Sequence, residues 1–139
     1  MKIVEFYELA GSGSDKWTAS GDAWYLNGGV MTNHVGDYSD FMSVSGATMT
    51  IKKAGNYLFH FRQGSYGPAN TRRNCGFLVN GSEEVISAAW NGSSTDFIGQ
   101  SCTFIRYLNV GNTVAPRTYT GGGAAALRRA LTCLYVVKF

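Results

Sequence analysis

Residues 50–61 read Thr50-Ile51-Lys52-Lys53-Ala54-Gly55-Asn56-Tyr57-Leu58-Phe59-His60-Phe61, and a second run, Gly76-Phe77-Leu78-Val79-Asn80-Gly81, follows about a strand's length later. In the first run a glycine-containing turn leads into an aromatic strand. Tyr57, Phe59 and Phe61 share one face of it, because side chains alternate along a strand. The second run ends in an Asn-Gly pair, which is typical of a tight turn between antiparallel strands. Together the two runs predict a β-sandwich.

Short β-prone runs alternate with turn signals from residue 23 to the C-terminus. We expect strands over residues 23–26, 30–34, 38–44, 47–51, 56–62, 75–80, 84–89, 100–108, 113–120 and 131–139. The last run is apolar on both faces apart from Thr132 and Lys138, which is typical of a central, covered strand. Residues 124–131 have helix propensity but no N-cap residue and too short a length, so we expect a loop or a strand extension there. The prediction is an all-β, two-sheet antiparallel jelly-roll sandwich over residues 23–139.

Bulk composition fits a single packed, turn-rich β domain. The 139 residues include 18 Gly and 2 Pro, and 45% are hydrophobic. The net charge of +3 is unevenly distributed, because residues 1–50 sum to −4 and residues 51–139 to +7. This asymmetry favours a solvated surface, with attraction between the acidic segment of one copy and the basic surface of another as the alternative.

The N-terminal residues 1–22 form a predicted arm and tether. An apolar, β-prone stretch is followed by Gly11-Ser12-Gly13-Ser14, a composition typical of flexible linkers. The arm either folds back as an edge strand of its own domain or adds a strand to a neighbouring subunit. Its expected contact residues are Ile3, Val4, Phe6, Tyr7 and Leu9.

Three cysteines, Cys75, Cys102 and Cys133, lie far apart without a Cys-x-x-Cys pair. Their odd number and apolar surroundings predict buried thiols rather than disulfides or a zinc site. No secretory leader opens the sequence and no apolar run approaches the ~18 residues of a membrane span. We therefore expect a protein made in a reducing cytoplasm, without a membrane partner.

Catalytic and cofactor motifs are absent from the sequence. Neighbouring Glu83 and Glu84 point to opposite faces of a strand, so they cannot act on one substrate. Of the two histidines, His34 and His60, the second lies between Phe59 and Phe61 and is a better candidate for a surface or oligomer contact than for catalysis. Asp37 and Asp40 favour turn formation over a calcium site. We expect no enzyme, no cofactor and no metal.

Two basic pairs, Arg72-Arg73 and Arg128-Arg129, fall in predicted loops. They are candidate contacts to an acidic partner, or solvated loop residues. Nucleic acid binding would need a broad basic stripe with stacking aromatic residues. The pI of about 8.8 is only mildly basic, and the positive charge is concentrated in two pairs. We expect no nucleic acid partner.

Three motifs and an apolar C-terminal strand follow one another in a familiar order. The motifs are Ala54-Gly55-Asn56-Tyr57-Leu58-Phe59, Phe77-Leu78-Val79-Asn80-Gly81 and Leu108-Asn109-Val110-Gly111-Asn112-Thr113-Val114. They resemble the jelly roll shared by the globular heads of complement first-component proteins and the tumour necrosis factor cytokines. Asn112 stands where that family has Asp, and its Phe-x-Gly motif near the last strand is absent.

This resemblance implies an oligomer, with a trimer favoured over a dimer, and gives the aromatic face of Tyr57, Phe59 and Phe61 to the core, to the oligomer interface or to both. Similar jelly rolls occur among phage structural proteins. By that analogy we expect a non-enzymatic virion protein, made in the host cytoplasm, that decorates and cements a phage capsid by binding the major capsid protein. The alternative is a receptor- or glycan-binding fibre head, with Trp90 and Tyr66 as exposed aromatics.

Overall fold

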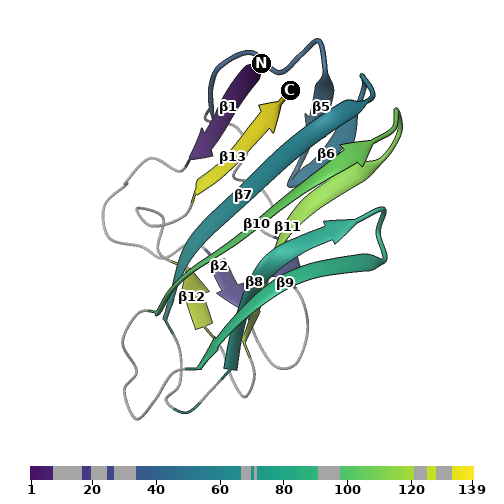
Figure 1. The fold of residues 1–139 in the computed structure, drawn as a ribbon. Helices are drawn as coiled ribbons and strands as arrows, with labels where there is room; N and C mark the ends of the chain where they lie inside the picture. The colour runs from purple at the N-terminus through teal and green to yellow at the C-terminus, as the bar shows by residue number, and fades with distance from the viewer. Residues whose placement is uncertain are drawn as a thin grey trace.

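The computed structural model describes residues 1–7, 17–19, 25–26, 34–66, 70, 72–90, 98–120, 125–127 and 133–139. Every regular element in these residues is a β-strand, and the strands form two antiparallel sheets that pack face to face (Figure 1). The expected all-β jelly-roll sandwich is therefore confirmed. No described helix is long and apolar enough to span a bilayer.

The first sheet runs in the order β2-β12-β7-β13-β1-β4, and β10 also pairs with β7. The second sheet runs β5-β6-β11-β8-β9, with β3 paired to β11. The strands are β1 (Lys2–Tyr7), β2 (Trp17–Ala19), β3 (Tyr25–Leu26), β4 (His34–Val35), β5 (Met42–Ser45), β6 (Thr48–Ile51), β7 (Gly55–Tyr66), β8 (Arg72–Val79), β9 (Glu83–Trp90), β10 (Ile98–Leu108), β11 (Thr113–Thr120), β12 (Ala125–Leu127) and β13 (Cys133–Lys138).

The two sheets enclose an aromatic core. Phe59 lies at its centre, with ring centroids 5.9 Å from Phe77 and 5.1 Å from Phe104. Tyr57 is also fully buried, and its hydroxyl donates a 2.5 Å hydrogen bond to the carbonyl of Lys53. Rings in offset and edge-to-face contact stabilise the sandwich beyond the burial of their area.

Strand β1 lies inside the first sheet, between β13 and β4. Its register with β13 pairs Lys2 with Lys138, which places the two ends of the chain side by side (Figure 1). Val4 and Phe6 point inward and are 0% and 3% exposed. The first residues of the predicted arm thus contribute to the core of their own subunit.

Two short segments differ from the sequence-based expectation, and a third, β12, forms a strand where a loop or a strand extension was expected. Residues 38–41 form a turn rather than the start of a strand, because the amides of Phe41 and Met42 both donate to the carbonyl of Tyr38. Strand β2 falls within the predicted tether. Strand β12 forms in the segment of high helix propensity, because pairing with β2 and β7 satisfies its backbone, so tertiary context overrides local preference.

The interior changes character along the strands. Toward the end remote from the termini, the buried side chains include the polar residues Gln63, Arg73, Asn74 and Gln100, all less than 9% exposed. The Gln100 side-chain amide donates to the carbonyl of Arg73 at 2.7 Å, and that of Gln63 donates to Gln100 Oε1 at 3.2 Å. Buried polar groups need such partners, so these bonds hold the amides in place.

Candidate assembly surface

The outer face of the first sheet carries a row of aliphatic side chains. The register places Ile3 opposite Val137, Val137 opposite Leu58, and Leu58 opposite Ile105. The row therefore crosses four adjacent strands, β1, β13, β7 and β10. Ile3 is 55% exposed and Ile105 is 64% exposed, while the two central side chains are half-buried by their neighbours.

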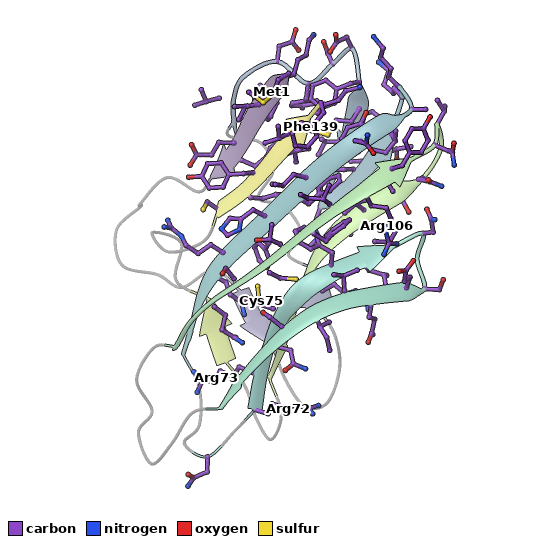
Figure 2. The ribbon with its side chains drawn as sticks, viewed as in Figure 1. Met1, Arg72, Arg73, Cys75, Arg106 and Phe139 are labelled. Atoms are coloured by element: carbon purple, nitrogen blue, oxygen red, sulfur yellow. The ribbon has the colours of Figure 1, made fainter. Side chains whose placement is uncertain are left out.

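Further apolar side chains continue this surface toward the chain ends. Tyr107, Phe139 and Met1 are all more than half exposed, and the backbone amide of Phe139 donates to the carbonyl of Asn56 on β7. Met1 and Phe139 lie next to each other at the same end of the sandwich (Figure 2). We call this surface the apolar face; it consists of Met1, Ile3, Leu58, Ile105, Tyr107, Val137 and Phe139.

A polar row borders the apolar face on the side away from the termini. It runs from Glu5 through Tyr135 and His60 to Thr103. His60 Nδ1 and the Thr103 hydroxyl share a 2.6 Å hydrogen bond. The hydrogen bond of Tyr135 to the Glu5 carboxylate raises the pKa of its hydroxyl, since losing the proton would set two negative charges together. Hydrogen bonds hold the side chains of this row in place, and the row includes the Glu5 carboxylate, whereas the side chains of the apolar face carry no charge.

The aromatic trio of β7 faces the other way. Tyr57, Phe59 and Phe61 are 0%, 0% and 2% exposed, so all three lie in the core of the subunit. Leu58 and His60, the residues between them, point outward. The surface that β7 offers to a partner therefore consists of the alternate set of residues.

The predicted contact residues of the arm divide in the same way. Ile3 belongs to the apolar face, whereas Val4 and Phe6 are buried. Tyr7 ends strand β1 and pairs with Cys133. Leu9 lies outside the described residues.

The loop predicted around Arg72 and Arg73 is wrong. Both residues belong to β8, where they pair with β9, and Figure 2 shows them at the end of the sandwich remote from the termini. The Arg73 side chain is fully buried, which lowers the pKa of its guanidinium. The strand begins earlier than expected because cross-strand pairing, rather than apolar composition, defines this segment. Arg128 and Arg129 lie outside the described residues.

Carboxylates in the described residues serve structural roles. Glu83 accepts a 2.7 Å hydrogen bond from the Arg106 guanidinium, which lowers the pKa of the carboxyl. Asp37 accepts a hydrogen bond from the Ser39 amide within a turn, and Asp40 pairs with Lys2. Within the described part of the chain, no group of His, Cys, Asp or Glu is arranged to hold a metal ion.

All three cysteines are buried free thiols, and burial raises the pKa of each. Sulfur nucleophiles need the thiolate form, so these residues are poorly suited to catalysis. Cys75 lies in the interior of the sandwich (Figure 2).

Leu58, Ile105 and Val137 were not singled out from the sequence. The sequence did contain a signal for them. Each alternates with buried residues along its strand, so it faces outward, where a polar residue would be expected, and yet it is aliphatic. Without the register that aligns the four strands, however, such residues are scattered along the sequence.

No protein-family model and no curated protein matches the sequence. Solved structures do match. Murine APRIL superposes with a TM-score of 0.65 at 12% identity, covering 99% of this chain and 98% of that one. The Eiger TNF of S. frugiperda has a TM-score of 0.62 at 13% identity, covering 99% and 91%. The PRD1 vertex protein P5 has a TM-score of 0.65 at 15% identity, covering 99% and 73%. The fold of this chain is therefore a jelly roll of the tumour necrosis factor type.

Proposed function

We propose that this chain is a non-enzymatic structural protein of a phage virion that forms a homotrimer through its apolar face and decorates the capsid. The apolar face is the observation that carries the proposal. Seven neighbouring apolar side chains on an outer face contribute little to the stability of an isolated sandwich. Contiguous patches of this kind mark interaction sites on soluble proteins.

Burial of the apolar face would make association favourable. Covering one aliphatic side chain of this size contributes about 1.5–3 kcal/mol, and a stable interface needs a few such central contacts. Ile3 and Ile105, the most exposed aliphatic members of the row, have the most to gain. A trimer is favoured over a dimer by the fold type and by the position of the face on one side of the sandwich.

Support for a virion role comes from the PRD1 vertex protein P5, which shares the fold over 99% of this chain. A capsid decoration protein acts without chemistry. Because it binds the assembled shell and not the loosened shell, it shifts the equilibrium between the two toward the assembled one. A trimer has three copies of each contact, which increases its affinity for the shell. The major capsid protein is the proposed partner.

Two measurements test the proposal in sequence. Sedimentation equilibrium should give a particle three times the mass of the 15.0 kDa chain. Capsids of its own virus that lack the protein should then gain thermal stability when the purified trimer is added, and electron cryomicroscopy should show it on their outer surface.

Each outcome separates one part of the proposal. A monomer at micromolar concentration would contradict the role of the apolar face. A trimer that neither binds nor stabilises the capsid would support trimer formation but contradict the decoration role. Saturable binding on a glycan array would in that case favour a fibre head.

A further inference from the structure

A second feature of the first sheet lies beyond the polar row, at the end of β7 and β10 remote from the apolar face. There the outer side opens into a cavity of about 310 Å³. We call it the glycine hollow; the described residues that line it are His60, Arg62, Gln63, Gly99, Gln100 and Ser101.

Gly99 explains why the sheet is hollowed at this point. The register sets it opposite Gly64 on β7, which is itself buried, and Gly99 carries no side chain to fill the surface. A Cβ atom added at Gly99 would meet nothing within 4 Å, so the space above this residue is open.

The chemistry of the lining favours an anionic, hydroxylated ligand. Arg62 supplies a permanent positive charge in a fork that matches a carboxylate, and the described lining residues include no acid to neutralise it. The hydrogen bond of His60 Nδ1 to Thr103 leaves Nε2 as the ring nitrogen that can serve a ligand. Ser101 adds a hydroxyl group.

The two glutamines hold the strands beneath the hollow. Their side chains point into the sandwich, where the Gln100 amide donates to the carbonyl of Arg73 and the Gln63 amide donates to Gln100. Both side chains are almost fully buried, so they fix the strand segments that present Arg62 and Ser101 before any ligand arrives. A site on fixed strands has a lower ordering cost of binding.

We propose that the glycine hollow binds the carboxylate group of a small hydroxylated ligand, namely an acidic monosaccharide. Arg62 would pair with the carboxylate, while His60 and Ser101 would bind hydroxyl groups. The cavity lies at the lower end of the roughly 300–1,000 Å³ range of ligand pockets, which suits a single sugar ring. The site lies beside the apolar face and not within it, because Arg62, the proposed carboxylate partner, is about 13 Å from Leu58 along β7 at the usual rise per residue.

Titration calorimetry or NMR with the full chain tests this inference. N-acetylneuraminic acid and galacturonic acid are the probes, and neutral galactose and acetate are the controls. We expect saturable binding of an acidic sugar in the millimolar range or tighter, at least about tenfold weaker binding of galactose, and weaker binding of acetate, since each control lacks one of the two recognised groups.

Three substitutions locate the site. Gly99→Leu should abolish binding by filling the hollow. Gly99→Ala, which should weaken binding, is the variant to use if leucine at this position prevents folding. Arg62→Gln should weaken binding at least about tenfold through loss of the charge-assisted pair. Arg106→Gln is the matched control on β10, since Arg106 pairs with Glu83 away from the hollow, and it should bind like the original protein.

Circular dichroism confirms that each variant is folded. The inference is overturned if neither acidic sugar binds, if acetate binds as tightly as the sugars, or if the Gly99 and Arg62 variants retain full affinity.

Discussion

The two outer faces of the sandwich differ at the same end of the molecule. On the first sheet, Ile3, Val137, Leu58 and Ile105 form an aliphatic row. On the second sheet, the corresponding outward row carries hydroxyl groups, with Ser43 opposite Thr50 and Thr50 opposite Thr113.

Apart from Ser43, both rows are built from β-branched or aliphatic residues that are compatible with strands, so strand propensity does not explain the difference. A hydroxyl row is compatible with water, whereas an aliphatic row is stabilised by being covered. The comparison therefore supports the proposal that the first sheet, and not the second, is the one that another protein surface covers.

The largest expected effect separates burial in the core from exposure on the apolar face, using two neighbours on β7. Phe59→Ala should lower the free energy of unfolding by about 3–5 kcal/mol, because it leaves a cavity among packed rings. Leu58→Ala, one residue away and facing outward, should change the stability of the isolated subunit far less. Urea denaturation at a concentration below that of self-association measures both.

Equal losses of stability in the two variants would show that Leu58 is part of the subunit core. The apolar face would then belong to the packing of the subunit itself, and its difference from the hydroxyl row would no longer support an interface on the first sheet.

The next effect concerns association. Ile105→Asp should weaken self-assembly by about 2 kcal/mol or more, roughly 30-fold in the dissociation constant, because a carboxylate would be buried at the interface. Thr50→Asp, the same substitution on the second sheet, should leave the oligomer intact. Sedimentation velocity over a concentration series measures both variants.

Dissociation of the Thr50 variant, with an intact Ile105 variant, would reverse the assignment of the two faces. The proposed trimer would then have to form through the second sheet.

Much of the fold could be predicted from the sequence because its signals are local. The alternation of Tyr57, Phe59 and Phe61 and the Asn80-Gly81 turn both survive in the structure, where Asn80 and Gly81 have the positive φ angles that such turns require. Strand β11 begins and ends where its composition predicts. Strand β2 could not be predicted, and β12 was expected only as one of two alternatives, since the pairing of these strands joins residues more than a hundred positions apart.

The surface sites depend on register, which sequence alone does not reveal. Ile3 and Ile105 become neighbours in one row only because β1, β13, β7 and β10 align. Arg62, Gly99 and Ser101 line one hollow only because the same register sets β7 beside β10. Arg73 shows the converse, because a charged residue suggested a loop and pairing placed it in a buried strand position.

A smaller effect probes the interior that lies between the two faces. Burial raises the pKa of the Cys75 thiol, and burial raises the pKa of Tyr57 to about 12. Both groups stay protonated in the folded subunit at pH values where the unfolded chain ionises. These two groups should therefore leave stability unchanged between neutral pH and the ordinary thiol pKa of about 8.5; stability should fall as pH rises above that value and fall further between about 10 and 12.

Urea midpoints at neutral and alkaline pH measure this decline, in the Ile105→Asp background so that association does not contribute. Cys75→Ala should show a shallower decline than its parent. Identical pH profiles would mean that the thiol ionises as easily in the folded subunit as in the unfolded chain.

The smallest effect concerns the ion pair that joins the edges of the two sheets. Arg106 on β10 contacts Glu83 on β9, and both side chains are well exposed to solvent. Exposed pairs gain little, because water screens the attraction and two long side chains lose freedom. Arg106→Gln should leave the urea midpoint unchanged within error, at low and at high salt. A clear, salt-dependent loss of stability would show instead that the two sheets are held together at this edge by charge, and the difference between their faces would then depend on that contact as well as on the core.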